Sequence, residues 1–394
     1  MINITEKKNC CGCTACESIC AHNAITMQPD ALGFLYPIVD ANKCVKCGLC
    51  DKVCQFHNDY KRYDNFDVPL VYGLRLKENG QLMCSQSGGA FWGIAQHIIG
   101  NNGIVYGAAF ESSWRVTHQK ATTADELERL RMSKYVQSDM RGVYKLVKED
   151  LKNGNTVLFS GTACQVAGLK AYIPAKMHTN LICIDIICHG VPSPKIWEDY
   201  IKYLEARYKS RIVKACFRDK RFGWHGAKET FKFENGEEAA RETNNRLYFS
   251  GITKRVSCAN CKFTNLKRVS DITVGDFWGI PKDSPYEKDN KGLSLALINS
   301  DKGLELFNNI KEKFIIEESN TTDCLQPQLK YPSRVSPLQD KFVKDYSTNG
   351  YLYAAKRYSD IGWRFHYRKM KNEIKMLIYK TIWALHIKEK PKGV

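Results

Sequence analysis

Two runs of cysteines near the N-terminus have the regular spacing of a metal-binding site. Of the 17 cysteines in this 394-residue chain, eight fall into runs with intervals of three, three and four residues, and the second run lies 34 residues after the first. The first run is Cys10, Cys13, Cys16 and Cys20, and the second is Cys44, Cys47, Cys50 and Cys54. Thiolates at these intervals bind [4Fe-4S] clusters, whereas zinc knuckles usually pair across a longer gap and disulfide frameworks belong to short secreted chains. The spacing therefore predicts iron–sulfur chemistry.

The repeat also predicts which cysteines share a cluster. In two-cluster bacterial ferredoxins the first three cysteines of each run bind one cluster, and the fourth crosses to the other. The expected sets are Cys10, Cys13, Cys16 and Cys54 for one cluster, and Cys44, Cys47, Cys50 and Cys20 for the second. Between the runs, the alternation of Leu32, Phe34 and Tyr36 up to Pro37 favours a short hairpin that shields a cluster from water. Residues 1–58 are thus predicted to be a two-cluster ferredoxin-like domain.

Length and composition place this domain at the head of a larger protein. A chain of 394 residues with 43% hydrophobic residues suggests two or three domains with a full core. We expect neither a signal peptide nor a transmembrane helix, because no apolar run approaches the required length. Many cysteines at iron–sulfur spacing suit a reducing compartment, so a cytoplasmic location is expected, with a location peripheral to the inner face of the membrane as the alternative.

Positive charge is concentrated at the C-terminal end. The formal net charge is +17, and residues 341–394 carry 13 basic against 4 acidic residues. In this tail Met370, Ile374, Ile378 and Ile382 recur at helical spacing among lysines and arginines. Packing against the chain's own domain and peripheral binding to a membrane are both open for this basic helix. Nucleic acid is the weaker alternative, because no recognised binding module accompanies the charge.

From residue 70 onwards the pattern becomes alternating strands and helices, which indicates an α/β architecture. Strands are expected at 70–76, 101–110, 156–161 and 181–188, and helices at 124–131, 141–154 and 193–208. Small-residue turns before helices, at 85–98 and 159–172, present backbone N–H groups that favour an anion such as a flavin pyrophosphate. The donors expected there are Ser87, Gly88, Gly89, Ser160, Gly161 and Thr162.

An ordered series of segments carries a family resemblance. The succession QSGGAFWGIA, RMSKYVQSD, FSGTACQVAGL, IICHGVPSPKIWEDYI, FRDKRFGWH and CANCKFTNLKRVSDITVGDFWGI spans about residues 70–350. It closely resembles the beta-subunit family of coenzyme F420 hydrogenases and dehydrogenases, in the branch with an N-terminal two-cluster ferredoxin domain. The resemblance implies an oxidoreductase subunit with FAD and iron–sulfur clusters. The domains expected are therefore 1–58, 70–350 and a basic C-terminal helical tail at 351–394.

The resemblance also assigns roles to individual residues. Arg131, Ser133, Lys134 and Tyr135 in RMSKYVQSD match the family's flavin-contacting segment. A third [4Fe-4S] cluster is implied beside the flavin. Its expected ligands are the C-x-x-C pair Cys258 and Cys261, with Cys164 and Cys188, which follow buried strands and should converge at one edge of the sheet. The C-x-x-C pair alone would equally suit half a zinc site or a redox dithiol.

A few further residues are candidates around the flavin. His189 and Lys134 are the catalytic candidates, His189 as a proton relay or flavin contact, with a structural role as its alternative. The segment VGDFWG at 274–279, which contains Asp276, is expected to form a turn. The loop FRDKRFGWH, with Arg218, Lys220, Arg221 and His225, would close over an anionic substrate.

The sequence leaves two functions of different classes open, an enzyme and an electron-transfer subunit. The first is a flavin-dependent reductase that takes electrons from a ferredoxin or another redox protein and acts on F420 or a different small-molecule or lipid-linked substrate, since relatives also occur in polysaccharide-synthesis loci. The alternative is an electron-transfer subunit of a larger hydrogenase or dehydrogenase complex without its own substrate. A homo-oligomer is possible in either case, and no nucleic-acid partner is expected.

Overall fold

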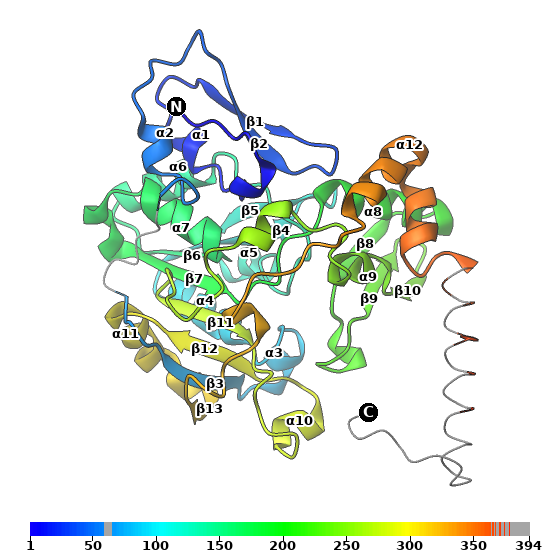
Figure 1. The fold of residues 1–394 in the computed structure, drawn as a ribbon. Coiled ribbons are helices and arrows are strands. Elements are labelled where there is room, and N and C mark those ends of the chain that lie inside the picture. The colour runs from blue at the N-terminus through cyan, green and yellow to red at the C-terminus, as the bar shows by residue number, and fades with distance from the viewer. Residues whose placement is uncertain are drawn as a thin grey trace.

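The computed structural model describes residues 1–58 and 65–363, together with residues 365, 367, 370, 371, 374 and 378 of the tail. The N-terminal domain lies on one side of a large α/β domain, and a smaller lobe lies beside both (Figure 1). Most of the linker between the two predicted domains, residues 59–64, falls outside the described residues.

The N-terminal domain is built of short elements around its cysteines. They are η1 (Lys7–Asn9), α1 (Ala15–Ile19), β1 (Ile25–Pro29), β2 (Leu35–Val39) and α2 (Leu49–Lys52). Strands β1 and β2 pair antiparallel, with Ile25 opposite Val39. The predicted hairpin is therefore present, but it begins earlier in the sequence than its apolar alternation indicates.

The tip of this hairpin packs on other parts of the chain. Leu32, Phe34 and Tyr36 are buried in one cluster with Ile196 of α8 (Pro194–Tyr208) and Phe342 of α12 (Gln339–Tyr358). Burying apolar side chains against a second domain removes them from water, which favours a fixed arrangement of the two domains. The hairpin thus serves mainly to dock the N-terminal domain, a role that its alternation alone does not reveal.

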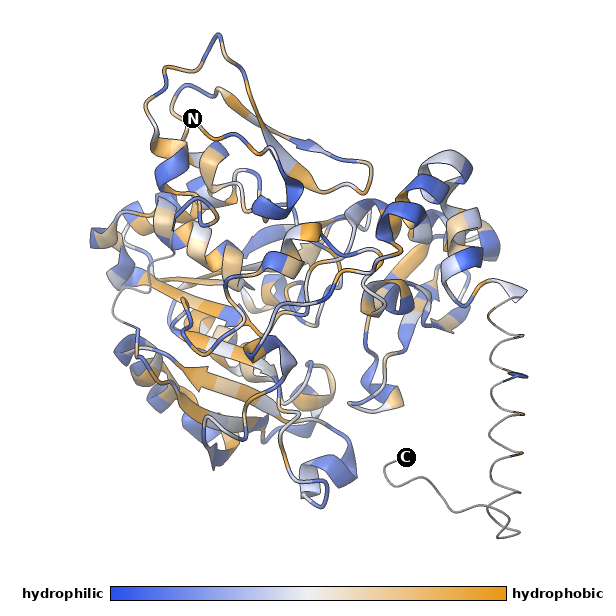
Figure 2. Cartoon of the chain, viewed as in Figure 1, coloured by the Kyte–Doolittle hydropathy of each residue, from blue (hydrophilic) through white to orange (hydrophobic). Residues whose placement is uncertain are grey.

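A single eight-stranded sheet forms the centre of the large domain, in the order β13-β3-β12-β11-β7-β6-β4-β5. The strands are β3 (Leu70–Leu76), β4 (Ile104–Phe110), β5 (Val116–Ala121), β6 (Val157–Thr162), β7 (Leu181–Ile186), β11 (Ile272–Asp276), β12 (Ser294–Ile298) and β13 (Phe314–Ser319). Strands β11, β7, β6 and β4 run parallel, and antiparallel strands extend the sheet on both sides. Hydrophobic residues concentrate along these strands (Figure 2), as expected for a sheet covered on both faces.

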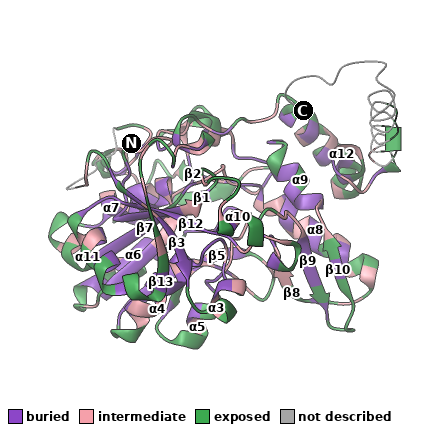
Figure 3. Ribbon diagram, turned by 90° about the horizontal axis from the view of Figure 1, so that it is seen from below, coloured by how far each residue is buried: buried purple, intermediate pink, exposed green. Residues whose placement is uncertain are grey.

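Helices cover the two faces of the sheet. One face packs on α4 (Ala90–Gly100) and α11 (Asp301–Ile310), and the opposite face packs on α6 (Val143–Lys152) and α7 (Ala163–Tyr172). Alternate side chains of a strand point to opposite faces of the sheet. Leu158 packs in the core on the side of α4 and α11, and Phe159 packs in the core on the side of α6 and α7. The strands are accordingly buried between the helical layers (Figure 3). Short elements complete the domain: α3 (Asn79–Met83), α5 (Ala124–Glu128), η2 (Ala175–Asn180), η4 (Val256–Asn260), α10 (Pro285–Asp289), η5 (Lys311–Lys313) and η6 (Pro327–Leu329).

The smaller lobe contains a second sheet that sequence periodicity does not predict. It has the order β10-β9-β8, with β8 (Ile212–Cys216), β9 (Glu229–Phe233) and β10 (Glu238–Arg241). The lobe is completed by α8, α9 (Thr243–Phe249), α12 and η3 (Lys220–Phe222). Its core is aromatic, with Trp197, Tyr200, Phe217 and Phe231 all fully buried.

The predicted boundary at residue 350 falls inside α12. Gly350 has a φ of 77° and interrupts the helix, yet Ala354 and Ala355 beyond it are buried. The tail helix lies largely outside the described residues. Of those that are described, Trp363, Tyr367, Met370, Ile374 and Ile378 are exposed, whereas Phe365 is half-buried and its ring centroid lies 4.7 Å from the Arg246 guanidinium. Within the described residues, every helix is too short or too polar to cross a membrane.

Candidate functional site

The structure gathers the second predicted cysteine set around one small cavity. Cys20, Cys44, Cys47 and Cys50 all line a space of about 20 Å³ in the N-terminal domain. Cys47 is exposed and Cys50 is buried. The cavity therefore opens a cysteine site towards the surface of the protein.

Members of the first predicted set lie together nearer the large domain. Burial raises the pKa of the Cys16 thiol, and negative charge at Cys10 and Cys54 raises it further, which reflects their proximity. Cys13 lies against α7, since a Cβ atom on Gly168 would stand 2.9 Å from its Sγ atom. The first set is thus on the inner side of the domain.

A third group of cysteines lies between the two domains. A cavity of about 40 Å³ is lined by Cys164, Cys188, Cys258 and Cys261, the four residues expected to hold a third cluster. Cys164 belongs to the first turn of α7, Cys188 follows β7, and Cys258 lies in η4. The carboxyl ends of adjacent parallel strands bring the first two together, in accord with the sequence argument.

Cys11 is a fifth thiol in this third site that the sequence argument does not identify. It lines the same cavity and is buried, and the Cys164 thiol is among the groups that shift its pKa. Because Cys11 directly follows Cys10, one peptide segment joins the first cysteine set to the third. Nothing in the C-C-G-C sequence marks this second role, since it depends on how the domains dock.

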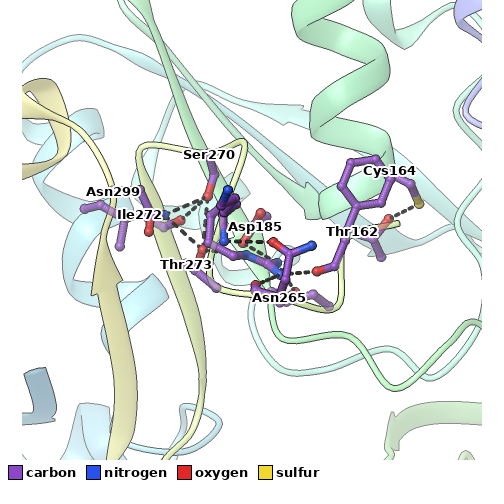
Figure 4. A network of polar contacts seen from close by, with 12 residues as sticks. Thr162, Cys164, Asp185, Asn265, Ser270, Ile272, Thr273 and Asn299 are labelled. Atoms are coloured by element: carbon purple, nitrogen blue, oxygen red, sulfur yellow. Dashed lines mark hydrogen bonds and ion pairs between the residues drawn. The ribbon is translucent and has the colours of Figure 1, made fainter. Parts of the chain in front are cut away.

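A buried ion pair anchors the loop that follows the C-x-x-C pair (Figure 4). Arg268, which lines the third cysteine cavity, donates from Nη2 to Asp185 of β7 at 2.9 Å and from Nε to Thr273 of β11 at 3.2 Å. The side chains of Arg268 and Asp185 are 3% and 0% exposed, so breaking the pair would leave a buried charge. The ion pair therefore fixes Cys258 and Cys261 relative to the sheet.

The donor set of the third cavity fits a cluster of several iron atoms. Thiolates are the ligands of [4Fe-4S] clusters, and each binds a different iron atom, so they stand further apart than ligands of one ion. Among the described residues, no three His, Cys, Asp or Glu side chains are close enough to hold a single metal ion. Burial raises the pKa of Cys258 to about 12 and of Cys261 to about 11, so iron must displace a proton from each thiol.

A much larger cavity, with a volume of about 370 Å³, lies at the carboxyl edge of the parallel strands. Most of the predicted flavin and catalytic residues line it. These are Ser87, Gly89, Arg131, Ser133, Lys134, Tyr135, Ser160, Gly161, Thr162 and His189. Its volume is within the range of small-molecule sites. Residues drawn from segments far apart in the sequence thus form one site.

This cavity and the third cysteine site share a wall. Thr162, Cys188, Gly190 and Val191 line both spaces. A ligand in the larger cavity would therefore contact the backbone and side chains that also enclose the cysteines.

Gly88 is placed differently from the other predicted flavin contacts. It is absent from the lining of the cavity, and a Cβ atom there would lie 1.9 Å from the Leu74 carbonyl oxygen and 2.5 Å from the Ser294 nitrogen. The missing side chain is therefore needed for close packing of this turn on β3 and β12. Ser87 beside it has a φ of 50°, an uncommon conformation for a residue with a side chain.

The two predicted anion-binding turns differ in how their donors are used. Helix α7 begins with a capping box, in which Thr162 and Gln165 side chains satisfy the first N–H groups. Helix α4 follows Gly89, which provides no side-chain cap, and its first residues Ala90 and Phe91 line the cavity. The start of α4 is therefore the better place for an anionic group.

Two predicted cations of the cavity are already engaged with protein groups. Arg131 donates to Glu128 at 2.8 Å and to the Gln81 carbonyl at 2.8 Å, and it stacks on Trp92 with 3.7 Å to the ring centroid. Lys134 donates from Nζ to the carbonyl oxygens of Arg129 and Arg131. Burial lowers the pKa of Lys134 to about 7, so this amine exchanges protons near neutral pH.

Two histidines that line the cavity, His189 and His118, are neutral at physiological pH. Burial and nearby Lys254 together lower the pKa of His189 to about 4. His118, which no sequence motif identifies, also has a pKa of about 4 because of burial, and it contacts Ser138 at 2.7 Å and the Ser160 carbonyl at 2.9 Å. Of the two catalytic candidates, Lys134 is the one with a pKa suited to proton transfer at pH 7.

Asp276 organises one side of the cavity, and the turn expected for its segment follows at Trp278 and Gly279. Asp276 ends β11 and accepts hydrogen bonds from Arg218 Nη1 and Trp224 Nε1, both at 2.6 Å. Trp224 stacks on Trp278 with ring centroids 4.7 Å apart. Arg218 and His225 of the predicted loop line the cavity, whereas Arg221 is exposed and pairs with Asp219.

Unpartnered polar atoms form part of the cavity lining. Both side-chain amide atoms of Gln86 and the Trp92 Nε1 atom are buried without a hydrogen-bond partner among the described residues, and both side chains line the cavity. Buried polar groups are usually satisfied, so these atoms indicate a bound molecule with its own donors and acceptors. A flavin, with a polar pyrimidine edge on an aromatic ring system, has these properties.

Comparisons with known proteins agree with this arrangement. Residues 154–323 match the family model for the C terminus of the beta subunit of coenzyme F420 hydrogenase/dehydrogenase. Residues 9–58 match a 4Fe-4S dicluster domain. The first matched region contains all four cysteines predicted for the third cluster, and the second contains both cysteine runs.

Individual relatives are more distant. The chain is 23% identical over 207 residues to the F subunit of the F420H2 dehydrogenase of Methanosarcina mazei, covering 49% of this chain and 58% of that protein. A chain of the F420-reducing [NiFe] hydrogenase complex from Methanosarcina barkeri has 16% identity and a TM-score of 0.45, covering 74% of this chain and 91% of that one. Taken with the cysteine sites, the two family matches show that this chain is similar to the coenzyme F420 hydrogenase/dehydrogenase beta-subunit family over residues 154–323 and to 4Fe-4S dicluster domains over residues 9–58.

Proposed function

We propose that this chain is an iron–sulfur flavoprotein reductase in which electrons enter through the N-terminal clusters and reach FAD in the large cavity. The ordered series of sites supports this proposal. The second cysteine set opens to the surface, the first lies against α7, and the third shares a wall with the cavity. A ferredoxin or another redox protein would be the donor.

The single observation that carries the proposal is the shared wall at Cys188. This residue lines the cysteine cavity, and the same residue lines the large cavity beside His189. Electron transfer between cofactors needs short separations, and one wall between two sites provides that separation. A flavin bound there would exchange single electrons with a cluster and electron pairs with an organic substrate.

The chain's own residues would divide the remaining tasks. The start of α4 would bind the anionic part of the cofactor, and Gln86 would hydrogen-bond its polar ring edge. Lys134 would transfer a proton, because its pKa of about 7 allows both protonation states at neutral pH. Trp278 and Arg218 would line the part of the cavity that receives the substrate. An aromatic, anionic molecule such as F420, or another small molecule, would fit there.

The alternative is that the chain serves as an electron-transfer subunit of a larger complex. The distant relative from Methanosarcina mazei is named as one subunit of a dehydrogenase, which favours this possibility. In this chain, however, the large cavity with unpartnered polar atoms favours a cofactor site of its own.

Anaerobic purification followed by denaturation tests the proposal. We expect FAD to be released, and in the intact protein we expect reduced ferredoxin to bleach the flavin absorbance. The Cys258→Ser variant should bleach more slowly, because the cluster beside the cavity is lost. Absence of flavin after reconstitution with FAD would contradict the proposal and favour the pure electron carrier. Candidate acceptors, beginning with F420, can then be assayed by their reoxidation of the flavin.

A further inference from the structure

Arg255 occupies a position between the first and third cysteine sites. Its side chain is fully buried, and it lines the third cysteine cavity. From Nε it donates to the Cys10 carbonyl at 2.7 Å, from Nη1 to the Gln137 side-chain oxygen at 3.0 Å, and from Nη2 to the Leu35 carbonyl at 2.9 Å. One guanidinium group therefore holds the N-terminal domain to the segment that carries Cys258.

Gln137 extends this contact to the next residue. Its Nε2 atom donates to the Cys11 carbonyl at 2.7 Å while its side-chain oxygen accepts from Arg255. Arg255 also approaches Gly12 closely, since a Cβ atom on this glycine would stand 2.8 Å from Nη1. The peptide segment that joins the first and third cysteine sites is thus fixed by two side chains from the large domain.

The charge of Arg255 is not balanced by a carboxylate among the described residues. Its three hydrogen bonds go to two backbone carbonyls and an amide, and it also lies over the Tyr36 and Phe34 rings, with 4.2 Å and 5.4 Å to the ring centroids. The other arginine of the third cavity, Arg268, is paired with Asp185. An unpaired cation without solvent destabilises the folded state, so a buried arginine of this kind needs an anion nearby.

We infer that Arg255 is the shared cation of the first and third clusters, which positions the Cys10–Cys11 segment between them and raises the reduction potential of both. A [4Fe-4S] cluster with four thiolates is an anion and gains a further negative charge on reduction. A fixed positive charge stabilises the reduced form more than the oxidised form, so it raises the potential. This inference rests on the cluster sites of the proposed function.

Redox titration of the reconstituted protein followed by electron paramagnetic resonance tests the inference. In Arg255→Gln, two of the three cluster potentials should move to more negative values. The potential of the cluster at Cys20, Cys44, Cys47 and Cys50 should stay unchanged, because the hydrogen bonds of Arg255 lie on the side of Cys10. Comparison with Cys258→Ser identifies which signal belongs to the third cluster.

Lys254→Gln is the matched control. Lys254 is the neighbouring buried cation. Burial lowers its pKa, and negative charge at Cys258 and Cys188 of the third site offsets part of that shift. Arg255, in contrast, hydrogen-bonds to the Cys10 carbonyl of the first site. The loss of Lys254 should leave the first cluster potential at the wild-type value. Unchanged potentials in Arg255→Gln, or a shift of the third cluster alone, would overturn the inference.

A second variant decides the matter if Arg255→Gln does not retain its clusters. Gln137→Glu places a carboxylate on Arg255 Nη1 and neutralises its charge without removing the arginine, so the same two potentials should fall. Potentials equal to wild type would then overturn the inference. Iron analysis of the same samples separates the two levels of argument: about eight irons per wild-type chain would reject the third cluster itself, whereas about 12 with unshifted potentials would reject only the role of Arg255.

Discussion

The hydroxyl oxygen of Thr162 lies 3.2 Å from the Sγ atom of Cys164, across the start of α7. Thr162 lines both the large cavity and the third cysteine cavity, while Cys164 lines only the second. Figure 4 shows the two side chains turned towards each other. The first turn of one helix therefore separates the proposed flavin site from the proposed cluster.

Iron content provides the first test of the cysteine sites. Anaerobically reconstituted protein should hold about 12 iron atoms per chain, from three clusters of four, and Cys258→Ser should hold about eight. Cys324→Ser is the matched control, because Cys324 is buried in a different apolar core and lines neither of the two cysteine cavities. Equal iron in Cys258→Ser and wild type would refute the assignment of this ligand.

The unpartnered side chain of Gln86 allows a test of the cofactor site. Gln86→Leu should weaken FAD binding roughly tenfold, since losing hydrogen bonds worth about 1.4 kcal/mol changes the dissociation constant by that factor. The same variant should leave the melting temperature of the flavin-free protein unchanged or higher, because it removes buried polar atoms without partners.

Gln119→Leu is the control for Gln86, since the Gln119 side chain bonds to Thr117 at 3.1 Å on β5, away from the cavity lining. Fluorescence titration of the flavin-free protein measures both constants. A Gln86→Leu protein that binds FAD as tightly as wild type would show that the amide faces no ligand.

Proton exchange at Lys134 should occur near neutral pH. Burial lowers the pKa of Lys134 to about 7, with Cys216 acting weakly in the opposite direction, so the amine is protonated below and neutral above that pH. Only the neutral amine reacts with acetic anhydride. Acetylation of Lys134, measured by mass spectrometry, should therefore reach its plateau just above pH 7, whereas an ordinary lysine amine continues to gain reactivity towards pH ~10.4. A Lys134 profile of the ordinary kind would contradict the shift.

Stability should depend on pH through Glu229. Burial raises the pKa of Glu229 to about 8; one of its carboxylate oxygens has no partner and the other accepts from the Asn245 nitrogen. The folded state therefore binds a proton that the unfolded state releases above its ordinary pKa of ~4.3. The contribution of Glu229 to the free energy of unfolding is fully present at lower pH. It is lost as the pH rises towards 8, by up to about 1.4 kcal/mol per pH unit.

Glu229→Gln removes the titrating group while it keeps an acceptor for Asn245. The melting temperature of this variant minus that of wild type should rise steadily between pH 5 and pH 8, because wild type loses stability over these ~3 pH units and the variant does not. A constant difference between the two proteins over this range would show that Glu229 has the same pKa in both states.

Local sequence patterns account for the elements that hold the sites, because strand, turn and cluster signals are encoded over short distances. The structure gathers Cys20 with Cys44, Cys47 and Cys50, as the crossing rule predicts, and β6 and β7 end where Cys164 and Cys188 are expected to converge. The capping box at α7 is a local signal of the same kind that our sequence argument missed, with Thr162 three residues before Gln165.

Other features depend on contacts between residues remote in sequence. Cys11 joins the third cavity because Arg255 and Gln137, both far along the chain, bind the Cys10 and Cys11 carbonyls. The turn at Trp278 and Gly279 is a local feature, whereas the bonds of Asp276 to Arg218 and Trp224 are tertiary contacts that the segment alone does not indicate. Gly88 resembles an anion-binding glycine locally, and only the position of Leu74 reveals that the sheet requires it.

The docked hairpin of the N-terminal domain has a consequence for the kinetics of electron delivery. The Leu32 carbonyl accepts hydrogen bonds from Ser193 Oγ at 2.6 Å and from the Lys195 nitrogen at 3.2 Å, and Gly33, with a φ of 80°, lies against Lys195. A domain held in this way is not a swinging shuttle, so the separation between its clusters and the third site stays constant during turnover. Transfer within the molecule would then be limited by tunnelling across a fixed gap, and raising the solvent viscosity should leave its rate unchanged.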